Sequence, residues 1–202
     1  VTTALFDTAL AWTAFQTNQY FGTGEVPTPL GSGTAMICPY EAFPARDAWV
    51  MIAAASDALF VRACEALAVP ALPQDPRFRD NPSRVANRKA LVEALSAVTG
   101  ALDSADVVAR LQRAGVPCAP INTIDKVLAE PQTEASGMVV PVKHPRLPDY
   151  KALSLPIRWD GERAGVTRVP PLLGEHTAEV LAELGYDAAT IQELARRHVV
   201  GL

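Results

Sequence analysis

The sequence predicts an α+β protein, a domain of helices with short antiparallel strands. Two apolar runs, 36–43 and 49–55, flank a polar break at 44–47, which is the pattern of a β-hairpin. Helical periodicity precedes this hairpin and dominates after it. Strands and helices do not alternate regularly, so the chain does not show the βαβ pattern of a complete Rossmann domain.

The first predicted helix, 4–19, carries apolar side chains on nearly every face. A helix of this kind has to be covered on several sides. The chain also begins without Met, at Val1. We therefore expect a fragment of a longer protein, or a chain with a tight partner. The apolar residues that cannot share one stripe are Leu5, Phe6, Leu10, Trp12 and Phe15.

A glycine turn, formed by Gly31, Ser32 and Gly33, marks the boundary between this helix and the hairpin. Glycines let the backbone adopt a positive φ and approach a ligand closely. A linker or a purely structural turn would show the same residues, because an isolated GxG pattern has low specificity.

Caps and periodicity predict the helices that follow the hairpin. Ser56 or Asp57 caps a helix that reaches 69, and Asn81 caps another helix with Pro82 in its first turn. A further helix starts at Asp103 or Ser104 and ends at Gly115. The inner stripe of the second of these helices is Leu91, Leu95 and Val98.

The last third of the chain mixes short strands and short helices. Two prolines make 116–121 extended, at a sheet edge or in a loop. Asn122 caps a short helix that Pro131 stops, and a proline-rich turn joins two strands. The remaining predicted elements are strands at 138–142 and 151–159, a linker at 163–171, and helices at 175–184 and 188–197, the last capped by Asp187.

Composition argues against several classes of partner. The net charge of −4 and the absence of a basic tract argue against nucleic acid. No apolar run approaches the length of a membrane span, so we expect no membrane. Cys38, Cys64 and Cys118 are widely separated, which fits reduced thiols and a cytoplasmic protein.

The residues alone show no catalytic constellation. The histidines His144, His176 and His198 have no metal-ligand spacing, so we predict no metal site. No GxSxG motif is present, and Cys118 lies in an apolar, proline-bound segment typical of a structural thiol. We therefore assign no catalytic residue within this chain.

Basic residues concentrate in one short window, and two interpretations remain open. Arg84 and Arg88 are one helical turn apart, so we expect them to share a helix face. The window is either a solvated face paired with Asp75 and Asp80, or a site for anionic groups such as phosphates. Its members are Arg77, Arg79, Arg84, Arg88 and Lys89.

Five ordered blocks resemble the C-terminal half of class III CoA-transferases, a group related to α-methylacyl-CoA racemases. They are the helix start at 1–9; Pro39-Tyr40-Glu41-Ala42-Phe43 with Asp47; Asp75-Pro76-Arg77-Phe78 with Asn81, Arg84, Asn87 and Arg88; 114–122; and 170–177. Ala48 replaces the glycine that usually follows the hairpin aspartate in this family.

The resemblance implies an enzyme that transfers CoA between carboxylic acids through an aspartyl-CoA thioester. It implies acyl-CoA and carboxylic acids as substrates, and no cofactor besides this CoA thioester. The nucleophilic aspartate is expected upstream of Val1, so this chain alone is expected to be inactive. The family's glycine-rich loop would correspond to Gly31, Ser32 and Gly33, which are our candidate substrate-binding residues.

The resemblance also implies the organisation of the complete protein. Residues 1–28 would be a central helix and linker of a Rossmann-like large domain that this chain leaves incomplete. Residues 29–146 would form the small domain, and 147–202 would return to the large domain as a helical segment. An interlocked homodimer is expected. The alternatives are a racemase-type member, or a non-catalytic module that associates with CoA or another partner.

Overall fold

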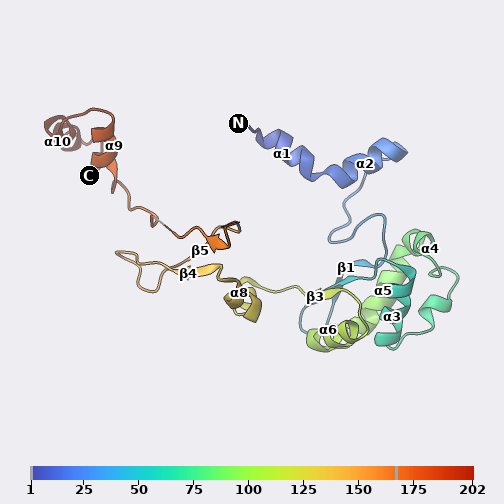
Figure 1. Ribbon diagram of the computed structural model, residues 1–202. Coiled ribbons are helices and arrows are strands. Elements are labelled where there is room, and N and C mark those ends of the chain that lie inside the picture. Colours follow the sequence, from blue (N-terminus) through green and yellow to red (C-terminus); the bar gives the residue numbers. More distant parts are fainter. Residues whose placement is uncertain (1, 167) are drawn as a thin grey trace. The chain divides into compact units, whose positions relative to one another are not determined.

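The computed structural model describes residues 2–166 and 168–202 (Figure 1). Val1, which begins the first family-like block, and Thr167, which falls in the predicted linker, lie outside the described residues. Contacts between residues divide the chain into two compact units, the first ending at Ile121 and the second beginning at Asn122. The predicted α+β class is confirmed.

The predicted first helix is two helices, α1 (Leu5–Trp12) and α2 (Ala14–Thr23). The break lies at Thr13, whose amide and hydroxyl both donate to the carbonyl of Leu10, at 3.0 and 2.8 Å. A threonine hydroxyl that bonds to the preceding turn competes with the helical ladder, which accounts for the interruption. No residue of either helix is buried in this chain, and Leu5 and Trp12 are 91% and 86% exposed.

The predicted hairpin is confirmed as β1 (Tyr40–Pro44) and β2 (Trp49–Ala53), which pair antiparallel with Phe43 opposite Val50. The third strand, β3 (Cys118–Pro120), pairs with the other side of β2, as the edge position predicted for 116–121 requires. Val50 and Ile52 alternate along β2 and are both buried, so one face of the sheet faces the core.

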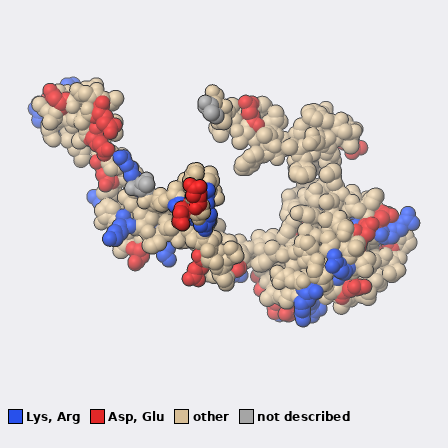
Figure 2. Space-filling view, viewed as in Figure 1, with Lys and Arg blue, Asp and Glu red and all other residues tan. Residues whose placement is uncertain are grey.

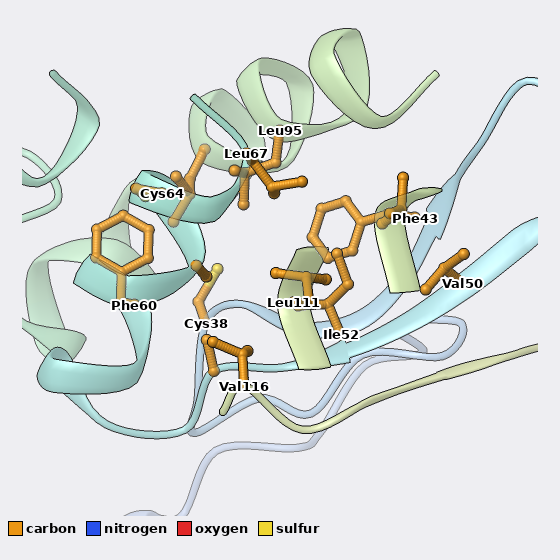
Figure 3. Close-up of a cluster of buried hydrophobic side chains, with 14 of the residues drawn as sticks. Cys38, Phe43, Val50, Ile52, Phe60, Cys64, Leu67, Leu95, Leu111 and Val116 are labelled. Atoms are coloured by element: carbon orange, nitrogen blue, oxygen red, sulfur yellow. The ribbon is translucent and has the colours of Figure 1, made fainter. Parts of the chain in front are cut away.

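Three helices contribute to the core of the first unit: α3 (Asp57–Ala66), α5 (Arg88–Thr99) and α6 (Ser104–Arg113). Figure 3 shows their apolar side chains meeting those of the sheet. Within the predicted inner stripe of α5, Leu91 and Leu95 are buried, and Val98 packs at the margin of the core. The buried set from these elements includes Phe43, Val50, Ile52, Phe60, Cys64, Leu91, Leu95, Val107 and Leu111.

Side-chain caps define the ends of these helices. Ser56 accepts a bond from the Leu59 amide at the start of α3, as predicted. The short helix α4 (Asn81–Ala86), which follows the 3-10 turn η1 (Leu72–Gln74), is capped by Asp80 and not by Asn81. The side-chain amide of Asn81 is instead hydrogen-bonded to the backbone of Met36 and Cys38, in the segment that precedes β1. This tertiary contact leaves Asp80 as the capping residue.

The start of α6 is tied to the hairpin. The carboxylate of Asp47, in the β1–β2 turn, accepts bonds from the amide and the hydroxyl of Ser104, at 2.7 and 3.0 Å. The backbone of Asp103 is the N-cap, but its side chain makes no capping bond. Gly115 follows the helix with φ +66°, which confirms its predicted role at the C-terminal end.

The second unit contains short elements that partly match the prediction. Asp187 caps the last helix as expected, with its carboxylate accepting from the Thr190 amide. Pro131 lies after the end of the helix that it was predicted to stop, and it is also the first residue of a further helix. The strand expected at 151–159 ends at Leu153. The elements are α7 (Ile124–Leu128), α8 (Pro131–Ser136), β4 (Val139–Pro141), β5 (Lys151–Leu153), β6 (Arg158–Trp159), β7 (Glu162–Arg163), α9 (Thr177–Glu183) and α10 (Ala188–Arg196).

Antiparallel pairs organise these strands, β4 with β5 and β6 with β7. The N-cap position of the short helix α7 is Thr123, whose side chain makes no capping bond, whereas Asn122, the predicted cap, donates to the Glu130 carboxylate at 3.0 Å. In the described part of the chain, no helix combines the length and the apolar character needed to cross a bilayer.

The core packing generates a stability prediction with a matched control. Val107 is fully buried on α6, whereas Val61 on α3 is 39% exposed. Val107→Ala should lower the free energy of unfolding by about 2 kcal/mol, because it removes two buried methyl groups and leaves a cavity. Val61→Ala should change it by less than about 0.5 kcal/mol. Urea-induced unfolding measures both, and equal effects would contradict the core described above.

Candidate functional site

An uncharged groove lies between α2 and the connecting segment that leads into β1. Its volume is about 1140 Å³, and it includes Gly31 and Gly33 of the glycine turn. No Lys or Arg occurs before Arg46 in the sequence, and Figure 2 shows few charged side chains over α2 and the connecting segment. The groove therefore suits an uncharged or apolar group better than a phosphate. Its lining includes Phe15, Tyr20, Val26, Pro29, Leu30, Met36 and Tyr40.

Gly31 is required for its backbone conformation. Its φ is +62°, in the left-handed region that residues with a Cβ rarely adopt. A Cβ built there would meet no atom within 4 Å, so crowding plays no part. The chain reverses here, because the amide of Gly33 donates to the carbonyl of Leu30 at 3.1 Å.

Gly33 lies close to two side chains and to the Leu30 carbonyl oxygen, which would be 3.3 Å from a Cβ at this position. A Cβ at this position would lie 3.3 Å from Nη1 of Arg88 and 3.6 Å from Oε2 of Glu41. These two side chains form an ion pair in which Nη1 donates to Oε1 at 2.5 Å. The pair therefore packs directly against the backbone of the turn.

Ser32, between these glycines, anchors the turn to the sheet. Its Oγ accepts a hydrogen bond of 3.0 Å from the amide of Ala42 in β1. β1 is an edge strand whose other side pairs with β2, so this amide has no strand partner on its outer side. The structure thus uses the Ser32 oxygen to satisfy an edge donor.

Arg88, the first residue of α5, joins three parts of the site. Its Nη2 donates to the carbonyls of Thr34 and Ile37, at 2.5 and 2.8 Å, while Nη1 binds Glu41. The side chains of Arg88 and Glu41 are only 17% and 13% exposed. Ion pairs and charge-assisted hydrogen bonds gain strength where water is excluded.

Asn81 and Arg84 of α4 hold the same segment closer to β1. Asn81 donates to the Met36 carbonyl at 2.8 Å and accepts from the Cys38 amide at 3.1 Å. Nε of Arg84 donates to the Cys38 carbonyl at 2.6 Å. The side chains of Asn81, Arg84 and Arg88 therefore bind the carbonyls of Thr34, Met36, Ile37 and Cys38.

The basic window accordingly separates into two groups. Arg77 and Arg79 are exposed and paired with neighbouring aspartates, as a solvated face predicts. Arg84 and Arg88 differ from these two, because their side chains are 0% and 17% exposed and their partners are distant in the sequence. They also belong to separate helices, since α4 ends at Ala86. Both expectations, a solvated face and an anion site, are wrong for these two arginines.

Arg84 shows why burial of the charge is tolerated. Besides Cys38, its guanidinium binds the Phe78 carbonyl at 3.3 Å and the carboxylate of Asp57 at 2.8 Å. The same group lies 4.6 Å from the ring centroid of Phe60. Sequence reasoning missed the role of these side chains. The signal available was the ordered spacing of Asn81, Arg84 and Arg88 in the family-like block, which charge counting ignores.

The described residues offer no alternative reactive centre. Among them, no group of three His, Cys, Asp or Glu side chains could hold a metal ion. Burial raises the pKa of the Cys38 thiol to about 11 and that of Cys64 to about 12, so both stay protonated near neutral pH. Cys118 is also shifted upward in pKa, again mainly by burial, which fits the structural thiol predicted for it.

Comparison with known proteins adds independent findings. A sequence model described as CoA-transferase family III matches residues 1–177. The succinyl-CoA:glutarate CoA-transferase of Mus musculus is 33% identical over 165 residues, 81% of this chain and 38% of that protein. The succinate–glutarate CoA-transferase of Agrobacterium fabrum is 33% identical over 181 residues, 90% of this chain and 45% of that protein.

A solved structure agrees with these sequence matches. The crystal structure of a CAIB/BAIF family protein from Brucella suis matches with a TM-score of 0.73 and 35% identity. The match covers 90% of this chain and 47% of the other. The chain therefore spans less than half the length of these three proteins.

The buried arginine generates a second stability prediction. Arg84→Met should lower the free energy of unfolding by about 3 kcal/mol, because two carbonyls lose a buried donor. Arg77→Met is the matched control, since its side chain is 58% exposed and its guanidinium contacts only neighbours in sequence, the Asp75 carboxylate and the Phe78 ring. Its unfolding midpoint should not move measurably. Chemical denaturation followed by circular dichroism measures both, and a neutral Arg84→Met would contradict the assigned role.

Proposed function

Because the chain belongs to CoA-transferase family III, we propose that it is the C-terminal portion of an enzyme that transfers CoA between carboxylic acids. The observation that carries this proposal is the family match over residues 1–177, which confirms the resemblance found in the sequence. Relatives named as CoA-transferases, at 33% identity, support the activity.

The proposed mechanism is nucleophilic catalysis by an aspartate that lies upstream of this chain. Its carboxylate attacks the thioester carbonyl of the donor, expels CoA thiolate and forms a mixed anhydride. The thiolate then attacks the aspartyl carbonyl, which yields an aspartyl-CoA thioester and releases the donor acid. The acceptor carboxylate repeats these steps in reverse, so the aspartate is regenerated and a new acyl-CoA leaves.

The glycine turn takes part in this proposal as a cover for the reacting groups. A mixed anhydride is open to attack by water, so transfer requires that water be kept away from it. Gly31 and Gly33, on either side of Ser32, line a groove together with apolar side chains. We assign this backbone to substrate binding, close to the acyl and thioester part of the substrate.

The lack of charge in the groove supports binding of the acyl and thioester part of the substrate there, and not of the CoA phosphates. Among the described residues that line it, none is charged. CoA phosphates need cationic or amide-rich partners, whereas a thioester and its alkyl arm do not. The two relatives reported above are named for succinyl-CoA or succinate and for glutarate, so we propose short dicarboxylic acids as the substrates to test first.

The assembly belongs to the same proposal. We infer an interlocked homodimer in which α1 and α2 are covered by the large domain or by the second subunit. The exposed apolar side chains of these helices support this arrangement, because large exposed patches mark interaction surfaces. The domain limits proposed for the complete protein are 1–28, 29–146 and 147–202, and three free cysteines support a cytoplasmic location.

The activity is tested with the complete enzyme, succinyl-CoA and glutarate. We expect glutaryl-CoA and free succinate in equal amounts, and a transient CoA adduct on a peptide upstream of this chain, both seen by mass spectrometry. Incubation in D₂O distinguishes the racemase alternative. Deuterium uptake at the α-carbon of a branched acyl-CoA without exchange between acids would overturn CoA transfer, and the absence of both reactions would favour a non-catalytic module.

The glycine turn generates a prediction for the complete enzyme. Gly31→Val places a β-branched residue at φ +62°, so the turn has to change its conformation. Turnover should fall by at least about tenfold, because a displaced cover misplaces the reacting groups. Stability should change less, since a Cβ at this position meets no neighbour. A normal rate with lost stability would contradict the prediction.

A further inference from the structure

We propose that Arg88, paired with Glu41, is a positioning residue that holds the glycine turn over the reacting groups; this inference rests on the proposed CoA transfer. Neither Arg88 nor Glu41 lines the groove. Nη2 of Arg88 instead donates to the backbone carbonyls of two residues that do, Thr34 and Ile37. Arg88 would therefore act through the backbone of the turn.

The turn needs such a support because it has little regular structure of its own. Between α2 and β1 the chain forms only turns and extended segments. The turn itself has one backbone bond, from the Gly33 amide to the Leu30 carbonyl, and the carbonyls of Thr34 and Ile37, which follow it, bind the side chain of Arg88 in α5. Arg88 is 54 residues from Thr34 and 47 from Glu41 in the sequence, so these bonds form only in the folded state.

Arg88 is distinguished from its two neighbours by how far it reaches. Asn81 and Arg84 bind Met36 and Cys38, next to β1. Arg88 binds Thr34 as well as Ile37, so its contacts extend to the residue that follows Gly33. Loss of the Arg88 fork should free the turn while the contacts beside β1 persist.

The absence of a Cβ at Gly33 completes the coupling. The guanidinium and the carboxylate of the pair approach the position of that Cβ to 3.3 and 3.6 Å. The backbone of the turn therefore lies against the pair, and Ser32 fixes its other side to Ala42. The ion pair thus lies beside the turn and is also bonded to the carbonyls of Thr34 and Ile37 that follow it, which is the arrangement expected of a positioning residue.

The test compares Arg88→Lys with Arg77→Lys in the complete enzyme. Lysine keeps the charge for Glu41 but lacks the planar fork that reaches two carbonyls. The readout is the ratio of acyl-CoA hydrolysis to CoA transfer, which does not depend on how much of the protein is folded. In Arg88→Lys this ratio should rise on the order of tenfold, with kcat reduced more than KM changes. Arg77→Lys should behave as wild type.

Hydrogen exchange supplies a readout that does not require activity. The amides of Gly33 and Ala42, which donate to Leu30 and Ser32 in the turn, should exchange faster in Arg88→Lys, while those of Val50 and Ile52 in β2 keep their protection. If Arg88→Lys does not fold, the double variant with Arg88→Met and Glu41→Gln serves the same test, because it leaves no unpaired buried charge.

The outcomes separate the two proposals. An unchanged ratio of hydrolysis to transfer overturns the positioning role, whether or not exchange at the turn is faster. A wild-type enzyme that transfers no CoA overturns the proposed function instead. In that case, unchanged exchange at the Gly33 and Ala42 amides also overturns the claim that Arg88 orders the turn, and faster exchange confirms that structural step alone.

Discussion

The first unit depends on the need to satisfy backbone carbonyls in a segment that has no regular structure. Backbone polar groups that lose water without gaining a partner are costly, and the carbonyls of Thr34, Met36, Ile37 and Cys38 find donors outside their own segment. Asn81, Arg84 and Arg88 provide them from two consecutive helices. This requirement fixes where α4 and α5 lie against the hairpin, and hence where the glycine turn lies beside the groove.

The same requirement explains why polar side chains are buried so close to an apolar core. Arg84 lies between the Phe60 ring and the Cys38 carbonyl, with its charge paired at the surface by Asp57. The neighbouring thiols have a raised pKa and contribute as small apolar groups. Helix α5 thus contributes Leu91 and Leu95 to the core and Arg88 to the site. Arg84 and Arg88 link the core helices to the segment that precedes β1.

Local rules predicted the parts of the fold that depend on local chemistry. The hairpin, the Ser56 and Asp187 caps and the left-handed Gly115 follow from adjacent residues. The break at Thr13 was missed because a hydroxyl inside a helix can bond in several ways. For the site, the sequence located the glycine turn, whose part in substrate binding stays a prediction. It could not identify the partners of Arg88, which lie 47 and 54 residues upstream.

The bond from Ala42 to Ser32 has a consequence for how the protein behaves in concentrated solution. An unpaired edge strand is a template for association with other chains. Here the turn covers one amide of that edge beside the apolar Phe43, so the segment proposed for substrate binding also discourages strand addition. Ser32 therefore has a structural role at the sheet edge that does not depend on its proposed part in substrate binding.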